Sequence, residues 1–196
     1  TRTGRWRSRS MQCTSRGLSG VPRAVLDTNV LVSALISPGG PSAALLLELR
    51  AGTFELVASP LLLEELADVL GRPKLRAYVL PQEAAAFVEL VRTEATVLDD
   101  PTPSGLALTS DPDDEFLVDL ARAASADVLV SGDGHVLALR GALPVMSPSE
   151  FVAHLMGTMG YRTRVSPEGP DRGVDIVAHK DELGFEPPII KVQVKS

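Results

Sequence analysis

The feature that most constrains this chain is the alternation of short apolar runs with helix-like segments between residues 23 and 155. The runs have strand length and are rich in Val, Leu and Ala; they lie at 23–26, 54–58, 95–98, 126–131 and 144–146. Strands that are joined through helices lie parallel in one sheet, and the helices cover both faces of that sheet. The pattern therefore predicts an α/β fold with a central parallel sheet.

Helix signals fill the segments between these runs. Helices are predicted after Ser42 as an N-cap, after Ser59-Pro60, across 81–93, across 116–124 and from the Ser147–Glu150 capping sequence. Residues 27–36, which begin with Asp-Thr-Asn, continue the apolar pattern until a Ser-Pro-Gly-Gly-Pro break. Each signal agrees with helices that alternate with the strands.

Two of the apolar runs end in an aspartate. Asp27 follows the first run in LDTN, and Asp133 follows the run at 126–131 in VSGD. In open parallel sheets, ligand sites form outside the carboxyl ends of the strands. Both aspartates are therefore expected at the edge of the sheet where a site forms.

Four motifs together resemble the PIN-domain nucleases, and more narrowly the toxin subfamily related to VapC. They are the LDTNVLVSAL opening, the RPKL segment, the DPDDEFL block and the VSGD ending, and the resemblance covers residues 23–155. The resemblance implies a PIN-like α/β/α fold and hydrolysis of phosphodiesters, usually in RNA, with Mg²⁺ or Mn²⁺. An antitoxin protein and a second copy of the chain in a homodimer are left open as partners.

Carried over residue by residue, the resemblance names four catalytic and metal-binding acids, Asp27, Glu65, Asp114 and Asp133. Hard divalent cations prefer oxygen ligands, and such ions activate water and neutralise charge that develops on a phosphate. Four close carboxylates would repel one another without a cation. Asp27 and Asp114 are favoured as direct ligands, and Glu65 and Asp133 as ligands either directly or through water. Supporting roles fall to Asn29 and Ser131, which would orient a water or a phosphate, and to Asp113.

Structural alternatives stand beside these assignments. Asp27 is also suited to capping the following helix, Glu64 competes with Glu65, and the VSGD sequence is also typical of a turn. Asp111, Asp113 and Asp114 compete for one role, because acids are favoured at any helix N-terminus. The spacing of seven residues between Asp114 and Ala121 favours Asp114, with Asp113 second.

Charge is distributed unevenly along the chain. Residues 1–22 carry five Arg and no acid, residues 23–155 carry 8 basic and 19 acidic residues, and residues 156–196 carry six of each. The acidic body argues against passive nucleic-acid binding through a basic face, but it suits a site that captures cations. Residues 1–22 are expected to be a disordered basic leader, with a phosphate-contacting arm or a transit peptide as alternatives.

Cysteine and apolar content bear on location. The single cysteine, Cys13, allows no internal disulfide, which favours a cytoplasmic protein. No apolar stretch approaches the roughly 18 residues of a membrane span, so no membrane association is expected. The sequence also lacks a Gly-rich phosphate loop and a Gly-x-Ser-x-Gly elbow, and its three His residues are isolated.

Residues 156–196 form a separate segment. A helix is predicted at 151–159, with strands at 160–165, 173–178 and 189–195, and the run from Met159 onward resembles Mrr-type restriction endonucleases of the PD-(D/E)xK class. That resemblance implies a second, vestigial metal site at Asp175, Gln193 and Lys195. The segment is expected to be a small, incomplete α+β appendage that is dispensable for folding and activity.

The sequence thus predicts a metal-dependent endoribonuclease, with a toxin role in a toxin–antitoxin pair as one option. Two alternatives remain open at this point. One is a DNA nuclease related to the restriction endonucleases. The other is a non-catalytic protein that binds nucleic acid or a partner on a nuclease fold, although the presence of all four acids argues against it.

Overall fold

A five-stranded parallel sheet forms the centre of the protein. The computed structural model describes residues 20–105, 108–109, 114–165, 175–179 and 190–193. The central strands are β1 (Arg23–Leu26), β2 (Glu55–Ala58), β3 (Thr96–Val97), β4 (Val128–Val130) and β5 (Val145–Met146). Their order is β3-β2-β1-β4-β5, and every neighbouring pair is parallel. The prediction of a central parallel sheet is confirmed.

Strand β1 lies in the middle of this sheet. Val25 is in register with Val57 of β2 on one side and with Leu129 of β4 on the other. Ala24, Val25 and Leu26 are each at most 1% exposed. A strand that is covered on both faces needs a continuous apolar run rather than an alternating one, and this run supplies it.

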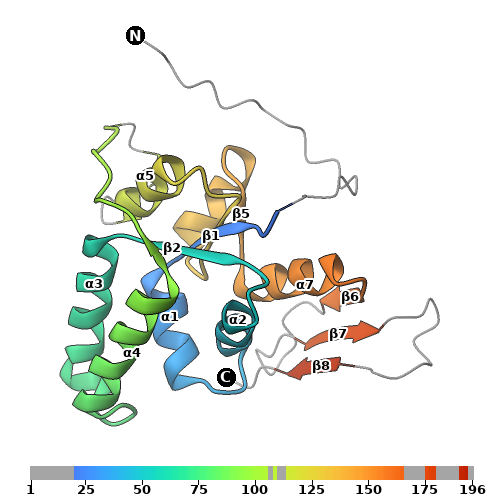
Figure 1. Cartoon of the computed structure of the whole chain (residues 1–196), viewed down its shortest axis with the longest axis horizontal. Helices are drawn as coiled ribbons and strands as arrows, with labels where there is room; N and C mark the ends of the chain where they lie inside the picture. The colour runs from blue at the N-terminus through green and yellow to red at the C-terminus, as the bar shows by residue number, and fades with distance from the viewer. Residues whose placement is uncertain (1–19, 106–107, 110–113, 166–174, 180–189, 194–196) are drawn as a thin grey trace.

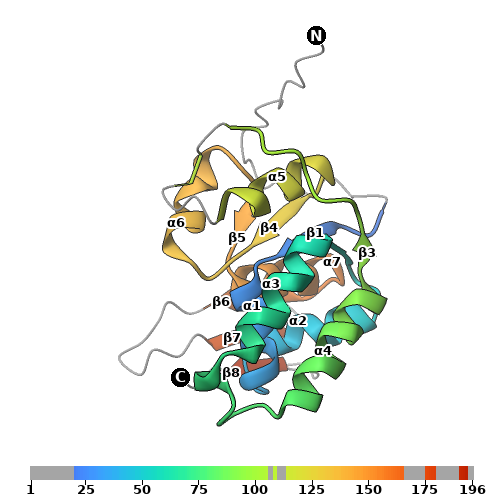
Figure 2. The ribbon, with the colours of Figure 1, turned by 90° about the vertical axis from the view of Figure 1, so that its left-hand side faces the viewer.

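Helices cover both faces of the sheet. The α-helices of the body are α1 (Thr28–Ile36), α2 (Pro41–Arg50), α3 (Pro60–Gly71), α4 (Pro81–Glu94), α5 (Glu115–Ala123), α6 (Gly134–Leu137) and α7 (Pro148–Thr158), with short 3-10 turns η1 (Pro73–Leu75) and η3 (Ala138–Gly141). Helix α5 lies on one face, against β1 and β4, and α1, α2, α3, α4 and α7 lie on the other (Figures 1 and 2). The predicted α/β/α arrangement is therefore confirmed.

Capping residues set most helix starts where the sequence predicts them. Ser59 caps α3 by accepting from the Leu62 backbone N–H, and Ser147 and Glu150 form a capping box at α7. The predicted N-cap of α2 at Ser42 is wrong, because α2 begins at Pro41 with Gly40 as its N-cap. Proline fits the first helical position, where its missing N–H has no intrahelical partner to lose. Ser42 consequently lies inside the first turn of α2.

The C-terminal segment forms a second, antiparallel sheet of three strands. Its strands β6 (Arg162–Val165), β7 (Asp175–His179) and β8 (Ile190–Gln193) lie in that order. Helix α7 contacts α2 and β5 of the body and also contacts β6 and β7. Ile176 and Ala178 of β7 are fully buried in the same apolar core as the central sheet. These contacts pack the segment against the body and argue against the expectation that it is dispensable for folding.

Two further predictions concern the N-terminal leader and membrane-spanning helices. Residues 1–19 of the predicted leader lie outside the described residues. Among the helices of the described ranges, none is long and apolar enough by itself to cross a membrane; α1 and α2 would pass that test only as a pair, bent by 96°.

Candidate active site

The pairing of β1 with β4 brings the ends of two motifs together. Leu26 and Val130 are register partners, so the residues that follow them, Asp27 and Ser131, leave the sheet side by side. The Asp27 backbone N–H extends the ladder by donating to the Val130 carbonyl at 2.9 Å. The carboxyl ends of two adjacent central strands thus present the LDTN and VSGD sequences at one edge.

Asp27 is held by hydrogen bonds on both of its carboxylate oxygens. The Ser131 hydroxyl donates to Oδ2 at 2.5 Å, and the Asn29 backbone N–H donates to Oδ1 at 2.9 Å. The second bond makes Asp27 the N-cap of α1, so the capping alternative is realised. A carboxylate has about four lone-pair positions. Capping therefore leaves Asp27 with acceptor capacity for a cation.

Asp133 is linked to Asp27 through hydrogen bonds to Ser131. The Ser131 Oγ accepts from the Asp133 backbone N–H at 2.9 Å, and the Asp133 Oδ1 accepts from the His135 backbone N–H at 2.7 Å. Asp133 thereby caps α6, as the turn alternative for VSGD implies. The structure gives Ser131 a clear position as the bridge between the two aspartates.

The electrostatics of this corner disfavour a bare negative charge. Asp27 is 2% exposed, and burial is the main reason that its pKa is raised. The hydrogen bonds from Ser131 and Asn29 lower the pKa, and the nearby charge of Asp133 raises it, so that the net shift of the Asp27 pKa is upward. A cation beside the two aspartates would reverse this penalty, because an opposite charge favours the ionised form.

Glu65 is linked to the start of α1 by a hydrogen bond from Thr28, a residue that the sequence analysis did not identify. The Thr28 hydroxyl donates to the Glu65 Oε2 at 2.6 Å, and Thr28 is 2% exposed. Thr28 directly follows Asp27, so this bond places the α3 carboxylate close to the start of α1. Glu64 is exposed on α3, whereas Glu65 is half-buried, which favours Glu65 in the choice between them. The hydroxyl in LDTN was the available signal.

Asp114 occupies the N-cap position of α5, and its side chain makes no capping hydrogen bond there. Helix α5 packs on β1 and β4. The competing Asp111 and Asp113 lie outside the described residues. Within the described ranges, no three His, Cys, Asp or Glu side chains form a group that could hold a metal ion. The structure thus brings Asp27 and Asp133 together, with Glu65 tied to the neighbouring Thr28, and convergence of all four acids stays a prediction.

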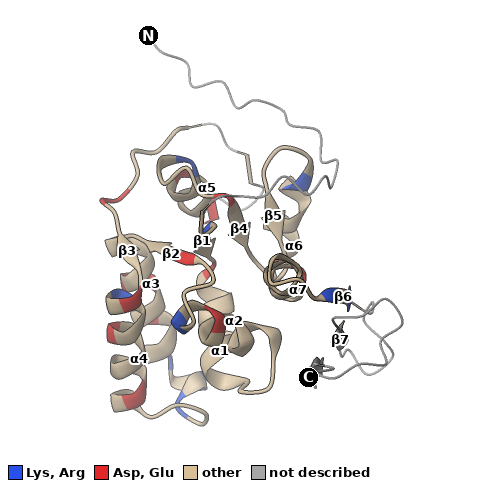
Figure 3. Ribbon diagram, turned by 45° about the vertical axis from the view of Figure 1, so that its right-hand side comes forward, with Lys and Arg blue, Asp and Glu red and all other residues tan. Residues whose placement is uncertain are grey.

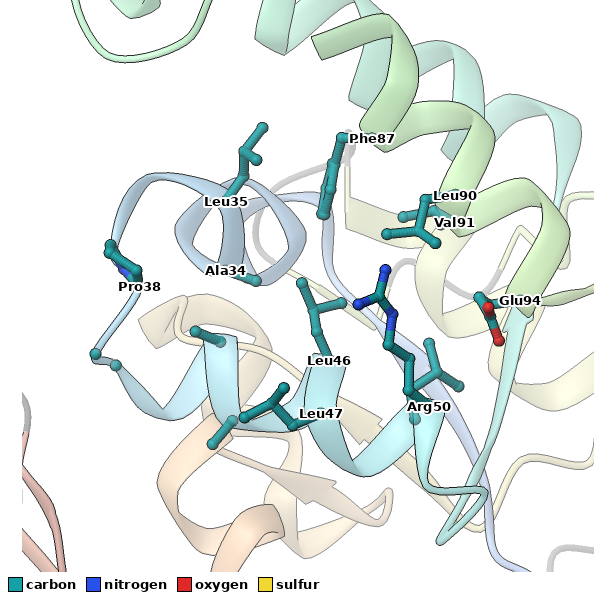
Figure 4. Close-up of a pocket in the computed structure, with 15 residues that line it drawn as sticks. Ala34, Leu35, Pro38, Leu46, Leu47, Arg50, Phe87, Leu90, Val91 and Glu94 are labelled. Carbon is teal, nitrogen blue, oxygen red and sulfur yellow. The ribbon is translucent and has the colours of Figure 1, made fainter. Parts of the chain in front are cut away.

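A polar pocket opens beside these aspartates. It has a volume of about 330 Å³ and is lined by Asn29, Val30, Ser33, Ser42, Gly132, Asp133 and Pro148. A larger pocket of about 610 Å³ lies between α1, α2 and α4 and contains none of the predicted site residues. Its walls are mainly apolar, with Leu35, Leu46, Phe87 and Leu90 facing the space and Arg50 beside Glu94 at one end (Figure 4).

Charged residues lie on several elements of the body. Acidic residues occur along α3 and α4 and near the ends of the central strands, while Lys and Arg lie singly on several elements in this view (Figure 3). A continuous basic face is the usual source of affinity for the phosphate backbone. Single cations on separate elements are not such a source.

The predicted second site lies on β7 and β8. Asp175 and Gln193 are register partners in this antiparallel pair, so their backbones lie directly opposite each other in the small sheet. Lys195 lies outside the described residues. The backbone register agrees with the arrangement that the resemblance implies for the first two residues.

Comparison with known proteins defines the class. Residues 23–135 match the family model of the PIN domain, and residues 146–196 match that of a restriction endonuclease. The chain belongs to the PIN-domain family, and both predicted resemblances are confirmed. Both matched families are nuclease domains, so the protein is of the nuclease class, a phosphodiester hydrolase that acts on nucleic acid.

Two particular proteins resemble this chain. The uncharacterised protein MJ1680 of Methanocaldococcus jannaschii is 26% identical over 140 residues, which cover 66% of this chain and 89% of that protein. The crystal structure of PAE2754 from Pyrobaculum aerophilum has a TM-score of 0.51 at 16% identity and covers 72% of this chain and 99% of that one. The second likeness shows a shared fold.

Proposed function

We propose that this protein is an endoribonuclease that depends on Mg²⁺ or Mn²⁺ and uses Asp27, Glu65, Asp114 and Asp133. The observation that supports the proposal is the buried Asp27, which is hydrogen-bonded to Ser131 and lies beside Asp133 at the carboxyl ends of β1 and β4. A buried carboxylate whose ionised form is disfavoured by its surroundings is typical of a functional site. The PIN-domain match gives that site its chemical class.

The residues present fit a hard divalent cation. The four acids offer only oxygen donors, and the Asp27 carboxylate is strongly desolvated. Asp27 and Asp114 would hold the ion directly, with Glu65 and Asp133 as further ligands directly or through water. When bound, the ion supplies an activated water and neutralises charge on the phosphate.

The protein's own groups fix the geometry of the ligands. Ser131 orients Asp27 by its short hydrogen bond, and Thr28 orients Glu65 in the same way. Asn29 is exposed at the start of α1 and lines the polar pocket, where its amide can orient a substrate phosphate or a water. Pre-set ligand positions raise affinity for the ion, because less rotamer freedom is lost on binding.

One assay tests the proposal. Purified protein is incubated with single-stranded RNA and DNA of the same sequence, with Mn²⁺, Mg²⁺ or EDTA, beside the Asp27→Asn variant. We expect cleavage of RNA that requires metal and is lost in Asp27→Asn. RNA cleavage that is equal in EDTA or in the variant would overturn the proposed centre.

We also propose a toxin role, with an antitoxin protein as the partner, in the cytoplasm. The supporting observation is the apolar pocket between α1, α2 and α4, next to which Leu47 is 69% exposed. Exposed apolar surface of this kind fits a helix with an apolar face, and a second copy of the chain in a homodimer is the alternative occupant. Induced expression should arrest growth, and the Asp27→Asn variant should relieve the arrest; growth that is equal with both proteins counts against the toxin role.

A DNA nuclease is the second candidate function. It is favoured by the match of residues 146–196 to a restriction endonuclease and by the register that pairs Asp175 with Gln193. Metal-dependent nicking of supercoiled DNA that is lost in Asp175→Ala but kept in Asp27→Asn would support this candidate. The reverse pattern would assign any DNA cleavage to the PIN site.

A further inference from the structure

The polar pocket is lined by α1, by Ser42 in the first turn of α2, by the turn after β4 and by Pro148 at the start of α7. Asn29 and Ser33 are four residues apart on α1, so they lie on the same face of that helix. Ser42 comes from the first turn of α2, and Asp133 closes the pocket at the end of β4. The volume of about 330 Å³ lies in the roughly 300–1,000 Å³ range of ligand pockets.

Ser42 is the informative residue of this pocket. It is only 8% exposed and lines the pocket, and within the described part of the chain its hydroxyl makes no hydrogen bond. Its oxygen is accessible from the pocket, so a ligand or a water there can complete its hydrogen bonding. Ser33 lines the same space from α1 and is half-buried.

The helix end next to Ser42 is also uncapped. Helix α2 has ten residues, its N-cap Gly40 offers no side-chain hydrogen bond, and its first turn contains no acid. The first N–H groups of a helix lack intrahelical partners and carry the positive end of the helix dipole. Such an end favours an anion, and phosphate is the anion that a nuclease substrate brings.

We propose that this pocket is a phosphate subsite, which binds a backbone phosphate next to the one that is cleaved. The inference rests on the proposed nuclease function and specifies how that site holds its substrate. The hydroxyl and the backbone N–H of Ser42 donate to the neighbouring phosphate, while Asp133 faces the cation. The subsite thus supplies neutral donors, which complement the Lys and Arg that lie singly on the described elements in Figure 3.

Two matched variants test the subsite. Ser42→Asp places a negative charge at the proposed phosphate position, and acids at a helix N-terminus favour the helix itself. Ser37→Asp is the control, because Ser37 is exposed nearby and does not line the pocket. We expect Ser42→Asp to raise KM for a short RNA about tenfold or more and to leave the melting-temperature rise with Mn²⁺ unchanged. Ser37→Asp should match wild type, and the milder Ser42→Ala should raise KM if the aspartate variant does not fold.

Modified substrates identify the group that is bound. A neutral methylphosphonate at one position next to the scissile bond should weaken binding to wild type, measured by fluorescence anisotropy, and should add little to the loss in Ser42→Asp. Equal losses of affinity in wild type and Ser42→Asp would overturn the subsite. So would a loss of affinity that appears when the sugar 2′-hydroxyl is removed and not when the phosphate is made neutral.

The two proposals fail in different ways. A wild-type protein without metal-dependent cleavage would contradict the nuclease function, while Ser42-dependent oligonucleotide binding would still support the subsite. Cleavage that depends on Asp27 together with binding that ignores Ser42→Asp would leave the nuclease function standing and remove the subsite.

Discussion

Replacing Asp27 by Asn tests the metal centre through stability rather than activity. The substitution keeps the shape of a side chain that is 2% exposed and retains an oxygen for the Asn29 N–H. It removes a buried charge whose pKa is raised by burial and by the charge of Asp133. Without metal at neutral pH, that charge destabilises the folded protein, so Asp27→Asn should melt at a higher temperature than wild type in EDTA.

Metal should reverse this order. At a free Mn²⁺ concentration of 100 times Kd, binding to the folded state alone stabilises wild type by about 2.7 kcal/mol. For a domain of this size, about 2–4 °C per kcal/mol converts this to a rise of about 5–11 °C. A roughly 100-fold loss of affinity in the variant leaves about 0.4 kcal/mol at the same concentration, which is about 1 °C.

Differential scanning fluorimetry of the two proteins in EDTA and across a Mn²⁺ titration measures both effects. Two results would refute the reasoning. One is an equal Mn²⁺-dependent rise in wild type and variant, which would place any metal elsewhere. The other is a variant that is less stable than wild type in EDTA, which would make Asp27 a net structural group whose hydrogen bonds outweigh its buried charge.

Further predictions address the pH dependence of stability, the Thr28 hydroxyl, Asp114 at the start of α5, and strand β7. In EDTA, the advantage of Asp27→Asn should shrink as the pH falls through the raised pKa of Asp27 toward its ordinary value of 3.8, because protonation removes the buried charge; melting curves from pH 7 to 4 check this, and a constant gap contradicts it. Thr28→Val should weaken Mn²⁺ binding about tenfold by calorimetry, and Thr28→Ser should restore it; equal affinities would make the Thr28–Glu65 bond purely structural. Asp114→Asn should lower kcat by orders of magnitude and Asp113→Asn by less, and the opposite order would shift the assignment by one residue. Ile176→Ala should cost about 2–5 kcal/mol in chemical denaturation, whereas a cost near zero would mean that β7 is not part of the core.

Local signals account for most of the fold that the sequence predicts. The run at β1 is apolar and buried from Ala24 to Leu26, and the Ser147 and Glu150 pair forms the capping box that its spacing indicates. The N-cap of α2 was misplaced because Gly-Gly-Pro-Ser offers two starts. Proline at the first helical position allows the earlier one.

Long-range contacts are the part that the sequence does not predict. Asp27 and Ser131 are 104 residues apart, and they meet because β1 and β4 are neighbours although they are not consecutive strands. Placement of both aspartates at strand ends predicts the same sheet edge, but it does not predict which strands are adjacent. The Thr28–Glu65 bond joins residues 37 apart on two helices, and no spacing rule links these positions.

Helix α7 packs against both matched regions, so the two regions share one apolar core. The PIN-domain match ends at residue 135 and the restriction-endonuclease match begins at 146, so α7 lies in the second match, yet it packs on α2 of the first. Three short antiparallel strands bury little surface by themselves. Ile176 and Ala178 are buried because the β6–β8 sheet packs on α7, and the face of α7 that these strands cover would otherwise be exposed. The core therefore continues across the boundary between the two matches. Substitutions in β7 should destabilise the PIN sheet through α7 before they affect any chemistry of Asp175.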